Sequence, residues 1–176
     1  AAAVRELRRL ALEEGLAPSC RRGCDHCCGQ HIVTSIAEAQ ALAAFVRREF
    51  TASGLQDLHR RTRSWHAWDG CREGDGGASP DCPLLVAGAC SAYPMRPLVC
   101  RAHYVTSAPH LCGPSALPAG QRRDPVHLTT VWQATRPFAR ILQERIEAAG
   151  IDSQRTSMLL PHWLAQEMGW EFPPSP

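Results

Sequence analysis

Two clusters of cysteine dominate what this chain of 176 residues can fold into. The first run is Cys20-x3-Cys24-x2-Cys27-Cys28, and the second is spread over residues 82–112. Two thiolates two or three residues apart can chelate one ion while the backbone between them turns beneath it, and zinc and iron–sulfur sites share this spacing. The cysteines number 9, an odd count, and they are clustered, so metal ligation explains them better than disulfide pairing does.

Eight of these cysteines form two groups of four, and we predict all of them as metal ligands: Cys20, Cys24, Cys27, Cys28, Cys82, Cys90, Cys100 and Cys112. Neighbouring side chains diverge, so we expect Cys27 and Cys28 to serve two metals or two edges of one cluster. Eight thiols could build two four-cysteine sites, or one cluster together with reactive thiols. Cys71 is isolated, and we interpret it as a small buried apolar residue.

Apolar residues at helical spacing predict a mostly α fold around the cysteine loops. The predicted helices cover 3–16, 35–50, 53–68, 127–149 and 161–169. Ser35 and Glu38 form a capping box at the start of the second helix. Pro137 predicts a kink or a break in the longest helix, and Gly150 is placed at its C′ position.

The longest predicted helix is expected to turn five apolar residues toward the core: Val131, Phe138, Ile141, Leu142 and Ile146. The tryptophans are interpreted as core and helix-packing residues: Trp65, Trp68, Trp132, Trp163 and Trp170. These patterns predict a single small helical domain, since one core accounts for all of them.

We expect this domain to span 1–176, with irregular cysteine-rich metal-binding loops at 20–31 and 82–112 and a proline-rich tail at 171–176. The stretch 82–125 has no sustained hydrophobic period. A stretch of that kind needs an external constraint to be ordered inside a compact domain, and metal supplies one.

The composition excludes several classes of protein. All 19 basic residues are arginine, and the chain has neither lysine nor asparagine, so it has no P-loop lysine, no Schiff-base lysine and no N-glycosylation site. The formal charge of +2 does not suggest a nucleic-acid surface. No apolar run approaches the roughly 20 residues of a bilayer span, and residues 1–16 do not resemble a signal peptide. We therefore expect a cytoplasmic protein that binds neither nucleic acid nor membrane.

The first cysteine run, followed by CPLL and then by CSAYPMRPLVCR, resembles a bacterial cysteine-cluster family described as zinc- or iron-chelating, the CxxCxxCC type. Two small departures are the three residues between Cys20 and Cys24 and the alanine at Ala92, where a larger aliphatic residue is usual. The resemblance implies metal at these cysteines, with Cys112 as the trailing one. The family is also similar to the cysteine-rich part of flagellin lysine N-methylases, which implies that an iron–sulfur cluster can occupy this framework.

Zinc and an iron–sulfur cluster, for which we expect the 4Fe–4S type, both remain open as cofactors. A closed four-cysteine zinc site is the simpler interpretation. The cysteine doublet suits a cluster with several edges. Arg96 and Arg101 lie close to Cys100 in sequence, where a cation can offset the charge of a thiolate-ligated cluster, although both could equally be solvated or paired with acids. Tyr93 and Tyr104 could donate hydrogen bonds to sulfur.

The histidines His26, His31 and His103 are tied by short loops to predicted ligands and are further candidates for metal contact. No familiar catalytic motif is present, so the sequence leaves open whether the protein is an enzyme. The first hypothesis is an iron–sulfur protein that serves electron transfer with an unknown protein or redox partner, or a protein-modification reaction. The alternatives are a non-enzymatic zinc-stabilised interaction module, and metal storage or delivery.

Overall fold

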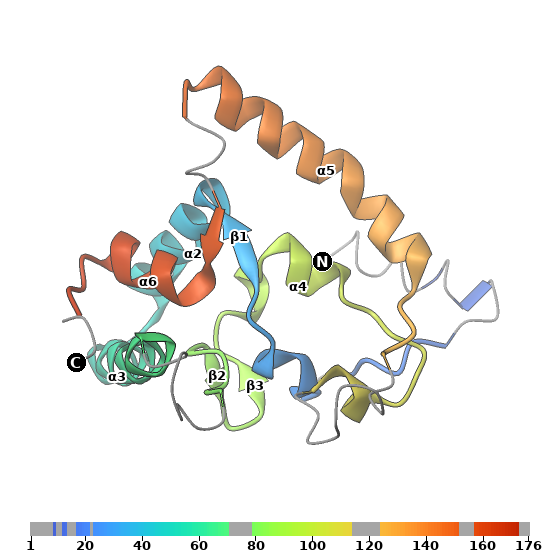
Figure 1. The fold of residues 1–176 in the computed structure, drawn as a ribbon, viewed down its shortest axis with the longest axis horizontal. Helices are drawn as coiled ribbons and strands as arrows, with labels where there is room; N and C mark the ends of the chain where they lie inside the picture. Colours follow the sequence, from blue (N-terminus) through green and yellow to red (C-terminus); the bar gives the residue numbers. More distant parts are fainter. Residues whose placement is uncertain are drawn as a thin grey trace.

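A computed structural model of the chain describes residues 9, 12–13, 17–21, 23–70, 79–113, 124–151 and 157–172. Within these ranges the protein is mostly helical, which confirms the predicted fold class. The α-helices are α2 (Ile36–Glu49), α3 (Ala52–Gly70), α4 (Leu98–Ala102), α5 (Thr129–Ala148) and α6 (Leu160–Met168). The short 3₁₀ turns are η1 (His26–Gly29), η2 (Tyr93–Met95) and η3 (Pro109–Cys112). Figure 1 shows α2, α3 and α6 gathered on one side of the molecule.

Helix α2 begins where the sequence predicts because its first turn is capped in both directions. The Ser35 hydroxyl accepts a hydrogen bond from the Glu38 amide at 3.4 Å, and the Glu38 carboxylate accepts one from the Ser35 amide at 3.3 Å. The helices predicted over 53–68 and 161–169 are confirmed as α3 and α6. The helix predicted over 3–16 and the residue Cys71 fall largely or wholly outside the described residues.

The core lies between α2, α3 and α6. It consists of seven buried residues: Leu42, Val46, Leu58, Leu84, Ala92, Leu160 and Leu164. Two of these, Leu84 and Ala92, come from the second cysteine loop, so that loop is anchored in the core. Trp65 and Trp163 are also buried, as predicted, and the Trp163 Nε1 donates a hydrogen bond to the Thr34 carbonyl at 2.8 Å.

Two short antiparallel strand pairs complete the described structure. Strand β1 (Val33–Ser35) pairs with β4 (Ser157–Leu159), which joins the segment after the first cysteine run to the segment before α6. Strands β2 (Leu85–Val86) and β3 (Ala89–Cys90) form a hairpin between two cysteines. Its turn residues 87 and 88 have φ angles of +49° and +73°, which indicates the type I′ turn that matches strand twist.

Helix α5 is the longest described helix, as predicted, and it runs from Thr129 to Ala148 without a break at Pro137. Of the kink or break predicted there, the break does not occur. Gly150 follows the C-cap residue with a φ of +70°, the left-handed conformation expected at C′. None of the described helices has both the length and the apolar character needed to cross a membrane.

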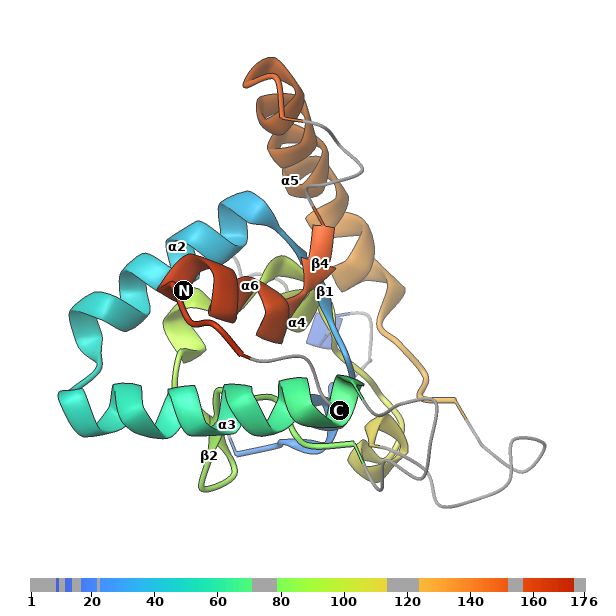
Figure 2. The same ribbon diagram turned by 60° about the vertical axis from the view of Figure 1, so that its left-hand side comes forward.

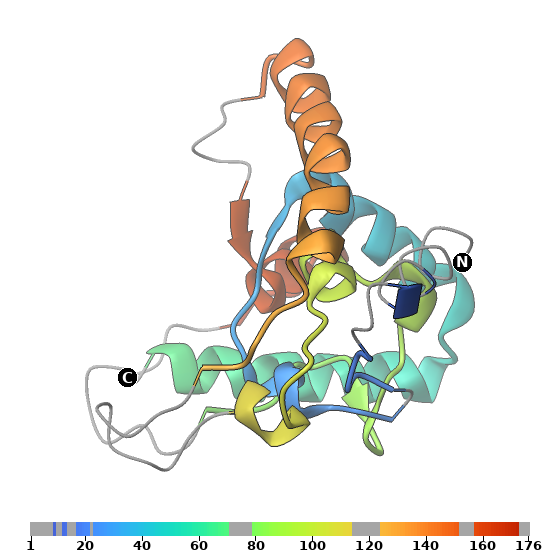
Figure 3. The same cartoon turned by 90° about the vertical axis from the view of Figure 1, so that its right-hand side faces the viewer.

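The apolar face of α5 is less buried than its periodicity predicts. Val131 and Ile146 are buried, but Phe138 is 59% exposed and Ile141 is 46% exposed, so the prediction that these two face the core is wrong. Trp132 is 52% exposed, and its interpretation as a core residue is wrong as well. The reason is the position of the helix: α5 packs on α4 and rises away from the α2–α3–α6 body, as Figures 2 and 3 show.

Candidate metal centre

The first cysteine run forms a tight turn that contains Cys27 and Cys28. Gly23 enters it with a φ of +83°, a conformation that glycine adopts without strain. The turn η1 is closed by hydrogen bonds from the Cys28 amide to the Asp25 carbonyl (2.7 Å) and from the Gln30 amide to the Cys27 carbonyl (3.1 Å). Both thiols are half-buried, so they are held close to the protein interior and remain accessible to an ion.

In the second run, two cysteines are positioned by residues of the core. Leu84 and Ala92 are buried, and each follows a cysteine by two positions. Their amides donate hydrogen bonds to the sulfur atoms of Cys82 and Cys90, respectively, and these bonds act to lower the pKa of each thiol. Such N–H donors stabilise a thiolate over a thiol. Burial of the leucine and the alanine therefore directs amide hydrogens at two of the predicted ligands.

The two runs are joined by direct hydrogen bonds. The Cys82 amide donates to the Cys28 carbonyl at 2.8 Å, and the Gln30 Nε2 donates to the Cys112 carbonyl at 2.7 Å. The turns η1 and η3 pack against each other. The first run therefore touches the beginning and the end of the second.

Cys20 is joined to the segment that follows α4. The Val105 amide donates to the Cys20 sulfur at 3.4 Å, and the Cys20 thiol lies 3.7 Å from the His103 carbonyl, which accepts its hydrogen. The Ser19 amide donates to the Val105 carbonyl at 2.8 Å. These contacts place Cys20 beside the second run, although the two are more than 80 positions apart in the chain.

One neighbourhood of thiols surrounds Cys112. Burial raises the pKa of Cys112, and together with the charges of Cys20, Cys27 and Cys24 it brings that pKa to about 11. Charges act on one another in this way only when they are close and incompletely screened. Four of the predicted ligands therefore lie near one another at this end of the region.

A second neighbourhood contains Cys82, Cys90 and Cys100. Burial raises the pKa of Cys82 and of Cys100 to about 12, and it also raises the pKa of Cys90. The charge of Cys27 acts in the same direction on all three. Cys27 thus borders both neighbourhoods.

The adjacent thiols Cys27 and Cys28 share one hydrogen bond. That bond lowers the pKa of Cys27 to about 7 and raises the pKa of Cys28. The pKa of Cys27 is therefore lowered, whereas the pKa values of Cys28, Cys82, Cys90, Cys100 and Cys112 are raised. More of the thiols can ionise only if a cation compensates their charge, which is what a bound metal does.

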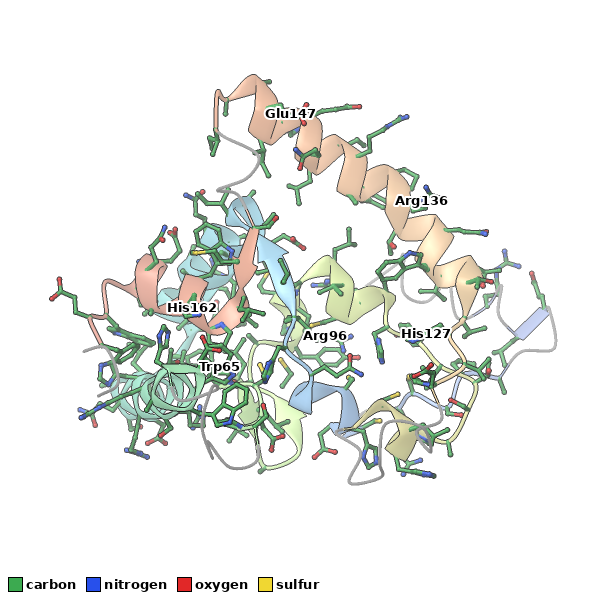
Figure 4. All side chains as sticks on the ribbon, in the orientation of Figure 1. Trp65, Arg96, His127, Arg136, Glu147 and His162 are labelled. Atoms are coloured by element: carbon green, nitrogen blue, oxygen red, sulfur yellow. The ribbon has the colours of Figure 1, made fainter. Side chains whose placement is uncertain are left out.

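Arg96 is a cation placed near these thiols. Its charge lowers the pKa of Cys27, Cys90 and Cys100. Its guanidinium lies 3.9 Å from the centroid of the Tyr93 ring, and its buried Nε has no hydrogen-bond partner among the described residues. Figure 4 shows Arg96 near the centre of the molecule. A buried N–H without a partner, on a cation whose charge acts on three thiols, is a group that an anionic metal–thiolate centre would satisfy.

The other predicted cofactor-binding residues have different surroundings. The Arg101 Nε donates to the Arg96 carbonyl at 2.7 Å, and its Nη2 donates to the Pro94 carbonyl, so Arg101 holds the turn η2 in place. Tyr93 is 49% exposed and lies against the Arg96 guanidinium. Tyr104 packs against the start of α5.

Of the three candidate histidines, His26 lies in η1 and is exposed. His31 packs its ring edge-on to Trp65 and Trp68, with centroids 5.6 and 4.7 Å away. His103 lies edge-on to His127 at 4.8 Å, and its buried Nε2 has no hydrogen-bond partner in the described part of the chain. Burial lowers the pKa of His103, and the charge of His127 lowers it further.

The donor types fit zinc or iron, because both metals are bound by soft thiolates. The donors are not yet arranged as ligands. Within the described ranges, no group of three or more Cys, His, Asp or Glu side chains is arranged so that it could hold a metal ion. Binding of a metal would replace contacts such as the one between Cys27 and Cys28 and would release protons from the thiols.

Sequence reasoning missed the amide donors of Leu84 and Ala92 and the contact of Cys20 with His103. A signal for the amide donors is present in the chain, since Cys82 and Cys90 are each followed two positions later by an apolar residue. No signal in the sequence indicates the contact of Cys20 with His103, because these two residues are brought together by tertiary structure alone.

Comparison with known proteins gives one match. A family model with the description "CxxCxxCC: Putative zinc- or iron-chelating domain" matches residues 19–115, which include all eight predicted ligands. No curated protein and no solved structure matches the chain.

Proposed function

The chain belongs to the CxxCxxCC family of zinc- or iron-chelating domains, and on that premise we propose that its cysteines hold an iron–sulfur cluster. The family supports metal binding by zinc or iron. The cluster would serve electron transfer with a protein partner, or the modification of a protein side chain.

The observation that carries the proposal is the position of Cys27. Its charge acts on Cys28, Cys82, Cys90, Cys100 and Cys112, so five thiols lie around one residue. A single structural zinc is satisfied by four ligands and leaves further thiols without a role. A 4Fe–4S cluster also takes four thiolates, but each binds a different iron atom, so ligands from both neighbourhoods around Cys27 can reach one centre.

The surrounding donors also favour a redox cluster. The amides of Leu84 and Ala92 point at sulfur, and the charge of Arg96 acts on three thiols. Hydrogen bonds to sulfur and nearby positive charge are the means by which proteins raise the potential of such clusters. A bound cluster would supply one-electron chemistry, and the chain's own residues would hold it, shield it and offset its charge.

Purification without oxygen tests the proposal. We expect a brown protein with about four iron and about four acid-labile sulfide per chain, as in a 4Fe–4S centre. Cys27→Ser should lose most of the iron, whereas the control Cys71→Ser should keep it, because the sequence sets Cys71 apart. A colourless protein with stoichiometric zinc would refute the proposal. If Cys27→Ser and Cys28→Ser both keep full metal content, the role given to the doublet is wrong.

One observation favours a second candidate, a zinc-stabilised interaction module without enzymatic activity. Cys20, Cys24, Cys27 and Cys112 form a neighbourhood of four thiols, the number that a closed tetrahedral zinc site needs. This candidate predicts zinc in whole-number amounts and no visible absorbance. It also predicts loss of folded structure when the metal is chelated.

A further inference from the structure

A groove of about 410 Å³ lies between α5 and the segment formed by η2 and α4. One wall carries Met95, Arg96 and Arg101, and the other carries Phe138, Ile141 and Arg145. Figures 2 and 3 show that α5 stands away from the α2–α3–α6 body. The first wall of the groove belongs to the second cysteine loop, and Arg96 both lines the groove and acts on the thiols.

The α5 wall of the groove is apolar and open to solvent. Phe138 is 59% exposed and Ile141 is 46% exposed, and both line the groove. Exposed large apolar side chains that share one concave surface mark an interaction site more often than scattered ones do. Aromatic residues and arginine are also the types enriched at protein interfaces. The composition of the groove is therefore that of a docking surface.

The arginines of the groove are not neutralised by carboxylates among the described residues. Arg101 donates to two backbone carbonyls, and Arg96 lies over the Tyr93 ring. Arg145, which is exposed, has no ion pair within the described ranges. Two carbonyls hold Arg101 in place, and the Tyr93 ring holds Arg96, without cancelling the charge of either. The groove therefore presents fixed positive charge beside apolar surface.

The one acidic residue in the groove lining, Glu38, does not offset this charge by pairing with an arginine. Its Oε1 accepts the Leu98 amide at 2.6 Å, and its Oε2 accepts the hydroxyls of Ser35 at 2.7 Å and Thr34 at 3.0 Å. These bonds direct the carboxylate toward the backbone of α4 and the cap of α2. An incoming acidic group would meet the arginines first.

We propose that this groove binds an acidic peptide segment of a partner protein, with apolar side chains packed on Phe138 and Ile141 and carboxylates paired with Arg96, Arg101 and Arg145. A basic or neutral segment is disfavoured because it would cover these cations without pairing them, and buried unpaired charge is costly. The proposal goes beyond metal binding and does not depend on which metal the cysteines hold.

Selection from a phage-displayed library of random peptides on the metal-loaded protein tests this inference. Selected peptides should be rich in Asp and Glu interspersed with apolar residues. Their affinity is measured by fluorescence anisotropy, and each variant is first shown to have the metal content of the parent. Arg145→Gln should weaken binding about fivefold, as for a partly exposed ion pair. Phe138→Ser should weaken it about tenfold or more, as for an aromatic anchor.

Arg140→Gln is the matched control. Arg140 is also exposed on α5 but is paired with Glu144 at 3.4 Å and does not line the groove. Arg140→Gln should change the affinity for the selected peptides by less than about twofold, since exposed ion pairs contribute little. Selection of basic peptides, failure to enrich any peptide, or equal affinities of the Arg145 and Arg140 variants would overturn the proposal. So would self-association that Phe138→Ser abolishes in sedimentation, because the occupant would then be a second copy of the chain.

Discussion

Replacing Glu38 by alanine should remove the hydrogen bonds that join α2 to the start of α4 and so destabilise the fold. The carboxylate accepts hydrogen bonds from the Leu98 amide at 2.6 Å, the Ser35 hydroxyl at 2.7 Å, the Thr34 hydroxyl at 3.0 Å and the Ser35 amide at 3.3 Å. Leu98 is the first residue of α4, so this side chain fastens the start of the helix that carries Cys100.

The expected loss of stability follows from these contacts. The hydrogen bond to the Leu98 amide is partly buried and involves a charged acceptor, which makes it worth about 1.5–3 kcal/mol. Loss of the capping contacts at Ser35 adds about 1 kcal/mol. Glu38→Ala should therefore lower the free energy of unfolding by about 3 kcal/mol. Glu38→Gln keeps an acceptor at one position and should lose about half as much.

Urea unfolding followed by far-UV circular dichroism measures the effect, with metal content determined on the same samples. For a slope of about 1–3 kcal/mol per molar urea, the midpoint of Glu38→Ala should fall by at least about 1 M. Metal content should fall with it, because Cys100 loses its support. Glu49→Ala, at the exposed end of the same helix, is the control and should stay within about 0.5 kcal/mol. A loss below about 1 kcal/mol for Glu38→Ala would refute the reasoning.

Three further outcomes are expected. Ala87→Gly should raise the melting temperature, because Ala87 has a φ of +49° and the left-handed conformation costs a non-glycine residue about 1 kcal/mol; a lower melting temperature would contradict the turn assignment. Trp163→Phe should cost about 2 kcal/mol in urea unfolding, because it leaves the Thr34 carbonyl without its donor, whereas Trp132→Phe on the exposed face of α5 should cost little. Burial lowers the pKa of His66, with the charge of His162 acting the same way and the Pro161 carbonyl and Asp69 opposing it. As the pH falls, the unfolded chain therefore binds a proton at His66 before the folded chain does. The stability contributed by neutral His66 is present above the unfolded pKa of 6.5 and is lost as the pH falls toward the folded pKa. His66→Gln should remove that part of the pH dependence, and identical pH profiles for the variant and the parent would contradict it.

The sequence predicts helices well where local signals agree. The capping box of Ser35 and Glu38 and the glycine at Gly150 each have a local physical cause, and each is where it was expected. Hydrophobic periodicity did not predict burial along α5. It indicates which residues share a face of the helix, but not whether another element covers that face. Phe138 and Ile141 share the predicted face, but α5 rises away from the body that would have buried them.

The candidate site, too, is only partly predictable from the sequence. The cysteines and their spacing identify the family, but the neighbourhoods around Cys112 and Cys27 depend on contacts between distant segments. The hydrogen bond between Cys82 and Cys28 and the one between Gln30 and Cys112 join residues more than 50 positions apart. No pattern within either run predicts which thiols meet. The strands β1 and β4 were also missed, since three residues are too few to show an alternating pattern.

The pairing of β1 with β4 has a consequence for the order of events during synthesis. All eight predicted ligands precede β4 in the chain, so they emerge from the ribosome before the strand that closes the fold. At about 5–20 residues per second, the segment from Cys112 to Ser157 takes several seconds to make. Throughout that interval all eight thiols have already been synthesised, while α6 has yet to cover its side of the core. Metal entry at this stage needs no opening of a finished protein, so the ion present beside the nascent chain has the first opportunity to bind.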